Sequence, residues 1–174
     1  MKSDTINNIL SDASHVIALI AYTVISVVVV TEDILLSWEK WPLVLIPVSV
    51  IIAWAIHIRM RLSSRLRIWI YMAFMMVELF FYGIHKESIF DFSMIMTGVV
   101  VLCALTGIVR LISLCQLTYY ITFLYNIVLE YLDKGLTNSG YYLRILLHIV
   151  ILTLVSFLGR FVIEKINQMF EEGK

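Results

Sequence analysis

The chain has 174 residues, of which 61% are hydrophobic and 15% charged, and its formal net charge at pH 7 is zero. Soluble domains have roughly 45–50% apolar and about 25% charged residues, so this composition excludes an ordinary soluble domain. The zero net charge gives no support for nucleic acid as a partner. The apolar residues form runs of about 16–20 residues, close to the length of helix that crosses a hydrocarbon core about 30 Å thick.

These runs predict six membrane-spanning helices, because a backbone in lipid must satisfy its hydrogen bonds internally. We place the spans at about 14–31, 42–58, 67–84, 92–109, 117–132 and 142–162. The predicted fold is therefore an all-α polytopic membrane bundle with short loops. Residues 1–162 are expected to form the six-span domain, and residues 163–174 a cytoplasmic helical extension.

The distribution of Lys and Arg predicts that both termini lie in the cytoplasm. With that orientation, nine of these residues lie inside and four outside, in agreement with the positive-inside rule. The inner set is Lys2, Arg59, Arg61, Arg65, Arg67, Arg110, Arg160, Lys165 and Lys174, and the outer set is Lys40, Lys86, Lys134 and Arg144. We expect the chain to lie in the cell (inner or cytoplasmic) membrane, with the lipid bilayer as its surroundings.

The fifth predicted span is the weakest, because its apolar run is short and carries polar groups at a spacing of four. These are Thr118, Thr122, Asn126 and Glu130. They form one stripe of a helix, which we expect to face the bundle interior or a hydrated groove. A re-entrant or interfacial fifth segment is the alternative; it would leave five spans and place the C-terminus outside. The charge distribution favours six spans.

Cys103 and Cys115 are the two cysteines, and no C-x-x-C spacing indicates a redox or metal site. We place both in one helix, roughly 18 Å apart at helical rise, which is too far for a disulfide. Cys103 and Gly107 then give the fourth helix a small-residue face for close packing. Residues 110–116 are the expected fourth loop.

Glu78 is the leading functional candidate, because a charged group within a span costs about 2.5–3.5 kcal/mol in the strongest cases. It shares a helix face with Tyr71, Met75, Tyr82 and His85, so it should point toward a partner helix. It is suited to binding a cation, a proton or a polar signal molecule. The alternative is a structural carboxyl that locks the bundle together.

Arg144 and His148 lie four residues apart in the sixth span and therefore share a face. An anionic ligand, or a carboxylate such as Glu130 or Asp133, would suit them. Snorkelling to lipid headgroups is the alternative for Arg144. For His148 a satisfied core histidine stands beside a pH switch. The candidate ligand-binding or coupling residues are therefore Glu78, Asn126, Glu130, Arg144 and His148.

Catalytic signatures are absent from the sequence. There is no H-E-x-x-H, no G-x-S-x-G and no glycine-rich phosphate loop. Glu78 and Glu130, the intramembrane acids, are expected at different depths. We therefore expect no catalytic residue, no cofactor and no metal ion in this segment.

The end of the chain is predicted to continue as helix beyond the last span. Ile163, Ile166 and Phe170 follow a three-then-four spacing, which is the start of a coiled-coil seam. These three residues would form an output helix. An amphipathic tail on the inner membrane surface is the alternative.

Short loops, sparse intramembrane polar groups and the continuing helix resemble the N-terminal multi-pass region of bacterial sensor histidine kinases or diguanylate cyclases. The resemblance covers the whole chain and is architectural, without a specific motif. It implies a homodimeric sensor module, as in a two-component system, that binds a small ligand among its helices and signals to a cytoplasmic output domain. Kinase or cyclase activity would then lie beyond Lys174. The alternatives are a small transport component, such as the substrate-binding membrane subunit of an importer, and a non-catalytic scaffolding protein.

Overall fold

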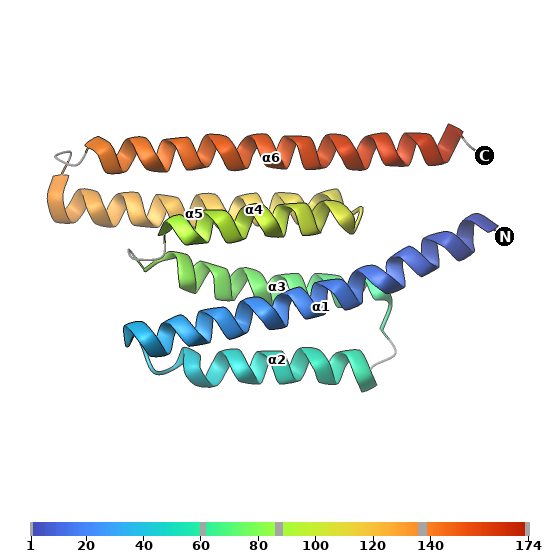
Figure 1. Cartoon of the computed structure of the whole chain (residues 1–174), viewed down its shortest axis with the longest axis horizontal. Coiled ribbons are helices and arrows are strands. Elements are labelled where there is room, and N and C mark those ends of the chain that lie inside the picture. Colours follow the sequence, from blue (N-terminus) through green and yellow to red (C-terminus); the bar gives the residue numbers. More distant parts are fainter. Residues whose placement is uncertain (1, 60–61, 86–88, 136–138, 173–174) are drawn as a thin grey trace. The chain divides into compact units, whose positions relative to one another are not determined.

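The computed structural model describes the backbone of residues 2–59, 62–85, 89–135 and 139–172, and the side chains of residues 14–59, 62–85, 90–135 and 139–169. Within these ranges the chain forms six α-helices and no strand (Figure 1). The helices are α1 (Lys2–Leu36), α2 (Pro42–Arg59), α3 (Ser64–Gly83), α4 (Ile89–Leu105), α5 (Val109–Lys134) and α6 (Ser139–Glu172). The predicted all-α helical bundle is confirmed.

Five of these helices are long and apolar enough to cross a membrane. The five candidate spans are Ser14–Leu36, Pro42–Arg59, Ser64–Gly83, Val109–Lys134 and Ser139–Met169. The remaining helix, α4, is apolar but has 17 residues, or about 25 Å of helix against a hydrocarbon core of about 30 Å. The fold is that of a multi-pass membrane protein.

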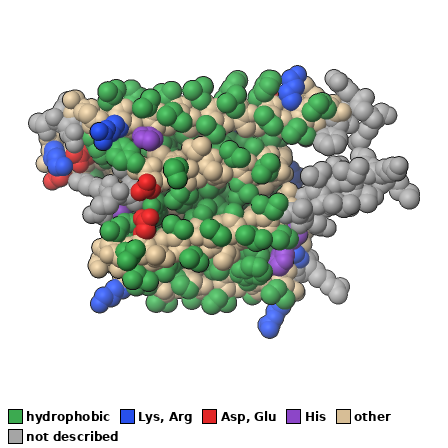
Figure 2. Space-filling view, viewed as in Figure 1, with side chains coloured by type: hydrophobic (Ala, Val, Ile, Leu, Met, Phe, Trp, Pro, Cys, Tyr) green, Lys and Arg blue, Asp and Glu red, His purple; other side chains and the backbone are tan. Residues whose placement is uncertain are grey.

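The outward surface of α6 is apolar along most of its length (Figure 2). Its exposed residues include Leu143, Leu147, Leu154, Phe157 and Leu158. Soluble monomers rarely expose contiguous apolar patches larger than a few hundred Å². Contact with lipid tails explains this surface, which agrees with the assignment of α6 as a span.

The fifth helix is longer than the predicted span 117–132, and its predicted start is wrong. α5 has 26 residues, and the shortest of the described helices is α4. The segment predicted as the fourth loop, 110–116, forms the first turns of α5. The chain turns instead at Thr106–Ile108, where Gly107 has a φ of 70°, a conformation that favours glycine.

The loop was predicted in the wrong place because this segment contains polar side chains that are typical of loops. Ser113 and Gln116 lie in this segment, and both accept hydrogen bonds from the Arg160 guanidinium of α6. Their side chains therefore have a hydrogen-bond partner in a neighbouring helix. A sequence pattern alone does not separate these two cases.

The placement of both cysteines in one helix is also wrong. Cys103 lies near the end of α4 and Cys115 in the second turn of α5. Their Sγ atoms are 3.4 Å apart, and both side chains are buried free thiols. The expected separation of roughly 18 Å fails because the chain turns between them. Gly107 is exposed in that turn and belongs to no packing face.

The chain divides into two compact units, Met1–Glu78 and Leu79–Lys174, with the boundary inside α3. In unit 1, α1 and α2 pack against each other. Trp54 Nε1 of α2 donates a hydrogen bond to Thr23 Oγ1 of α1 at 3.1 Å. Nearby, the ring centroids of His15 and His57 are 5.2 Å apart. Polar and aromatic contacts thus hold the first two helices together.

Unit 2 contains the end of α3 with α4, α5 and α6, and the last three helices all contact one another. Its core stacks Phe92 of α4 on Tyr119 of α5, with ring centroids 5.5 Å apart and planes within 14°. Phe123 packs beside them, 6.0 Å from Phe92. The Tyr119 hydroxyl forms a 3.0 Å hydrogen bond with Ser93 Oγ, so the buried phenol is satisfied.

Candidate functional site

A hydrogen-bonded cluster around Glu78 joins the three helices of unit 1. Tyr22 Oη of α1 donates to Glu78 Oε1 at 2.6 Å, and Ser26 Oγ, also of α1, donates to Oε2 at 2.6 Å. Ser49 Oγ of α2 lies 3.1 Å from Oε1. Glu78 is 5% exposed. We call these four residues the Glu78 cluster.

Helical spacing explains how the cluster forms. Tyr22 and Ser26 are four residues apart on α1, so they project from the same face. Glu78 lies on the buried face of α3 with Tyr71 and Met75, both fully buried. The structure therefore turns Glu78 toward partner helices, as its position on that face predicts. Burying a carboxyl is costly unless its oxygens are hydrogen-bonded, and the three hydroxyls meet that requirement.

The polar stripe of α5 faces the interior of unit 2, as predicted. Thr122 is fully buried, Asn126 is 1% exposed and Glu130 is 2% exposed. Asn126 Nδ2 donates to the backbone oxygen of Gly83 at 2.7 Å and to that of Thr122 at 2.9 Å. Thr118, one turn earlier, bonds back to the oxygen of Leu114. The stripe thus ties α5 to the end of α3.

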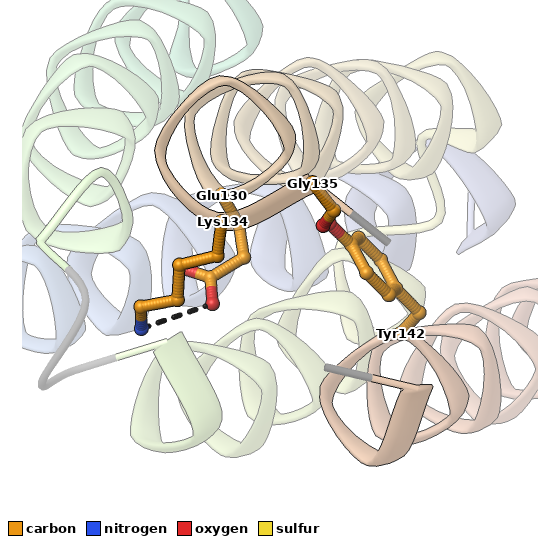
Figure 3. Close-up of polar contacts among 4 residues, drawn as sticks. All are labelled: Glu130, Lys134, Gly135 and Tyr142. Atoms are coloured by element: carbon orange, nitrogen blue, oxygen red, sulfur yellow. Dashed lines mark hydrogen bonds and ion pairs between the residues drawn. The ribbon is translucent and has the colours of Figure 1, made fainter. Parts of the chain in front are cut away.

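One polar contact lies within the end of α5, and another joins that end to the first turn of α6 (Figure 3). Glu130 forms an ion pair with Lys134, at 3.2 Å between Oε1 and Nζ. Tyr142 Oη donates to the backbone oxygen of Gly135 at 2.9 Å, and Gly135 has a φ of 62° at the end of α5. The charge of Glu130 therefore has a local structural partner.

Arg144 and His148 both lie against one aromatic ring. The Arg144 guanidinium carbon is 6.0 Å from the centroid of Phe90, and the ring of His148 is 5.3 Å from the same centroid. The distance for Arg144 is at the outer limit of a cation–π interaction. Arg144 is exposed and His148 is half-buried. They share a face, as predicted, and that face packs on α4.

The five candidate residues do not belong to one compact unit. Glu78 belongs to unit 1, whereas Asn126, Glu130, Arg144 and His148 belong to unit 2. Sequence reasoning missed Tyr22, Ser26 and Ser49 as the partners of Glu78. The four-residue spacing of Tyr22 and Ser26 in an otherwise apolar run was an available signal. Ser49 gave no such signal, because single serines are common in membrane spans and usually serve only packing.

The chemistry of the Glu78 cluster is hydrogen bonding and proton exchange. It contains one carboxyl, one phenol and two alcohols, and it includes neither an imidazole base nor a thiol. Within the described part of the chain, no three His, Cys, Asp or Glu side chains come together in a way that could hold a metal ion. The polar atoms of the cluster bond directly to one another at 2.6 Å, so its chemistry is confined to hydrogen bonds and a proton.

Comparison with known proteins gives no assignment. No family model, no characterised protein and no solved structure matches the chain.

Proposed function

We propose that this chain is the membrane-embedded sensor, or input, module of a bacterial signalling protein in the cytoplasmic membrane. In this proposal α6 passes the signal to a cytoplasmic output domain such as that of a two-component system. The observation that carries the proposal is the length of α6. It runs from Ser139 to Glu172 without a break, through the predicted membrane boundary near residue 162.

The length of α6 exceeds what a membrane crossing needs. Its 34 residues correspond to about 51 Å at 1.5 Å per residue. The hydrocarbon core accounts for about 30 Å of that length. About 20 Å of continuous helix therefore extends past the core, and a rigid helix is the element that transmits rotation or translation across a membrane surface.

Polar contacts hold α6 on its neighbours at several levels. Near the middle, the hydroxyls of Tyr120 and Thr153 are 2.7 Å apart. Further along, Arg160 of α6 donates to Ser113 Oγ of α5 at 3.3 Å and also to Gln116. A movement of α5 in unit 2 would therefore be transmitted to α6 through these hydrogen bonds. This coupling supports the proposed relay.

The proposed homodimer uses the exposed side of the output helix. Ile163 is 1% exposed and is covered within the chain, whereas Ile166 is 39% exposed. The side chain of Phe170, the third residue of the predicted seam, lies outside the described residues. Of the two seam residues whose side chains the structure describes, Ile166 is the one available to a second copy.

Cysteine crosslinking in native membranes tests this proposal. In a background where Cys103 and Cys115 are replaced by serine, I166C should give an intermolecular crosslink with a short bifunctional thiol reagent. I163C, one turn earlier on the same helix, is the matched control and should give little. Equal absence of crosslinks at every position from 164 to 169 would contradict the proposed dimeric relay.

A small transport component is the second candidate, and the Glu78 cluster is the observation in its favour. Transport would give uptake of a substrate into proteoliposomes that E78Q abolishes, whereas a relay would not. A scaffolding role would leave both uptake and crosslinking at Ile166 negative.

A further inference from the structure

The hydroxyls of the Glu78 cluster have more acceptors than they have protons. Ser26 Oγ lies within hydrogen-bond distance of Glu78 Oε2 at 2.6 Å and of the Tyr22 backbone oxygen at 2.9 Å. Ser49 Oγ lies 3.1 Å from Oε1 and 2.6 Å from the Ile46 backbone oxygen. A hydroxyl has one proton and two acceptor lone pairs. Ser26 can therefore donate to Glu78 or to its own helix, but not to both at once. Ser49 has a third acceptor, Tyr22 Oη, at 2.6 Å.

Because the Ser26 hydroxyl can change its acceptor, both carboxyl oxygens of Glu78 have hydrogen bonds in either protonation state. When the carboxyl is ionised, Tyr22 donates to Oε1 and Ser26 donates to Oε2. Ser49 Oγ, 2.6 Å from Tyr22 Oη, donates to that phenol oxygen. When it carries a proton on Oε2, that proton is donated to Ser26 Oγ, and Ser26 turns its own proton to the backbone oxygen of Tyr22. Ser49 goes on donating to Tyr22, and Tyr22 goes on donating to Oε1. The two states differ by rotation of hydroxyl hydrogens, with no heavy atom displaced.

The distances within the cluster exclude a metal cation of the calcium type at its centre. Ca²⁺ holds oxygen ligands at about 2.3–2.6 Å, so ligands at right angles are about 3.3–3.7 Å apart. The hydroxyl oxygens of Tyr22 and Ser49 are 2.6 Å apart, and Tyr22 Oη and Glu78 Oε1 are also 2.6 Å apart. The oxygens bond directly to one another, which leaves the proton as the ion that this arrangement accommodates.

We infer that the Glu78 cluster is a proton-binding site, in which Glu78 accepts and releases one proton and Ser26 reorients to match. The groups that face the carboxyl are Tyr22 and Ser26 from α1 and Ser49 from α2. Tyr22 is the one titratable group among them, and none is a cation. No charged partner among the described residues of unit 1 therefore fixes Glu78 in its ionised state. The inference does not rest on the relay proposed for α6.

Infrared difference spectroscopy on the full chain in lipid vesicles tests this inference. Acidification should produce a reversible band of a protonated carboxylic acid. E78Q should lose that band, whereas D33N and E130Q, which remove the two other buried acids of the candidate spans, should keep it. A band identical in E78Q and the unsubstituted chain would overturn the inference, as would a Glu78 band that does not change with pH.

S26A provides a second test that does not remove the carboxyl. It should keep the pH-dependent band but shift it to higher frequency, because the protonated acid loses the oxygen that accepts its proton. An unshifted band would show that Ser26 is not the acceptor and would overturn the mechanism. Failure of crosslinking at Ile166, by contrast, bears on the relay alone.

Discussion

Replacing Gly83 by alanine should destabilise unit 2, because the end of α3 lies very close to α4 and α5. A Cβ atom at Gly83 would be 2.6 Å from Thr122 Cγ2 and 2.9 Å from two ring atoms of Phe92. Distances below 3.0 Å between carbon atoms that are not bonded require some part of the structure to move. The question is therefore which neighbour can yield.

Neither neighbour of Gly83 has free space to move into. The ring of Phe92 is buried against Tyr119 and Phe123. The Thr122 methyl is held by its own hydroxyl, which donates to the Thr118 backbone oxygen at 2.8 Å. Overpacking of a well-packed core costs about 1–3 kcal/mol, so G83A should lower the free energy of unfolding by that amount.

Two further glycines are matched controls. Gly98 of α4 has no atom within 4 Å of an added Cβ, so G98A should stabilise the helix by about 0.5–1 kcal/mol. Gly159 of α6 is intermediate, because its added Cβ would meet Ile112 Cδ1 at 3.1 Å, the end of a flexible side chain. The expected order of stability is G98A, then G159A, then G83A. The first and last should differ by about 1.5–4 kcal/mol.

Reversible unfolding with sodium dodecyl sulfate in mixed micelles measures these differences directly. The loss of helix, followed by far-ultraviolet circular dichroism, is the readout, because all four tryptophans lie in unit 1. Each variant is compared with the unsubstituted chain under the same conditions. A G83A chain as stable as G98A would refute the close approach of α3 to α4 and α5. The packing described for unit 2 would then be incorrect at that point.

Two other predictions concern unit 2. Cys103 and Cys115, with Sγ atoms 3.4 Å apart, should form an intramolecular disulfide when membranes are treated with iodine, with loss of two hydrogens in the intact mass; independent alkylation of both thiols after that treatment would contradict the α4–α5 turn. N126A should lower the free energy of unfolding by about 1–3 kcal/mol, because it leaves the buried backbone oxygen of Gly83 without the hydrogen bond that Asn126 donates; unchanged stability in the same detergent titration would show that this hydrogen bond does not form.

The helices themselves could be predicted from the sequence, because hydropathy and helical period act locally. The polar stripe of Thr122, Asn126 and Glu130 was expected to face the interior, and all three residues are buried. The same argument placed Glu78 on a face directed toward partner helices. These predictions succeed because the position of a side chain around a helix depends only on the spacing of residues along it.

The boundary between α4 and α5 could not be predicted in this way. Arg110, Ser113 and Gln116 are polar and resemble loop residues in the sequence. In the structure, Ser113 and Gln116 accept hydrogen bonds from Arg160 of α6. The partners of Glu78 were missed for a related reason. Ser49 lies 29 residues from Glu78 in sequence, and the pairing depends on how α2 packs in unit 1. Contacts between helices carry information that local periodicity does not.

The central claim of this account is that α6 leaves the membrane on the cytoplasmic side, where it can act on an output domain. That orientation requires α4 to cross the bilayer with its 17 residues. An even number of spans then places both termini on the same side.

Reporter fusions after Lys174 in bacteria test this claim most directly. Green fluorescent protein, which is fluorescent in the cytoplasm, should be bright there, and alkaline phosphatase, which is active outside, should be inactive. Fusions after Trp38, in the first outer loop, should give the reverse and serve as the control. Active phosphatase and dark fluorescent protein after Lys174 would mean that α4 does not cross, and would contradict the relay.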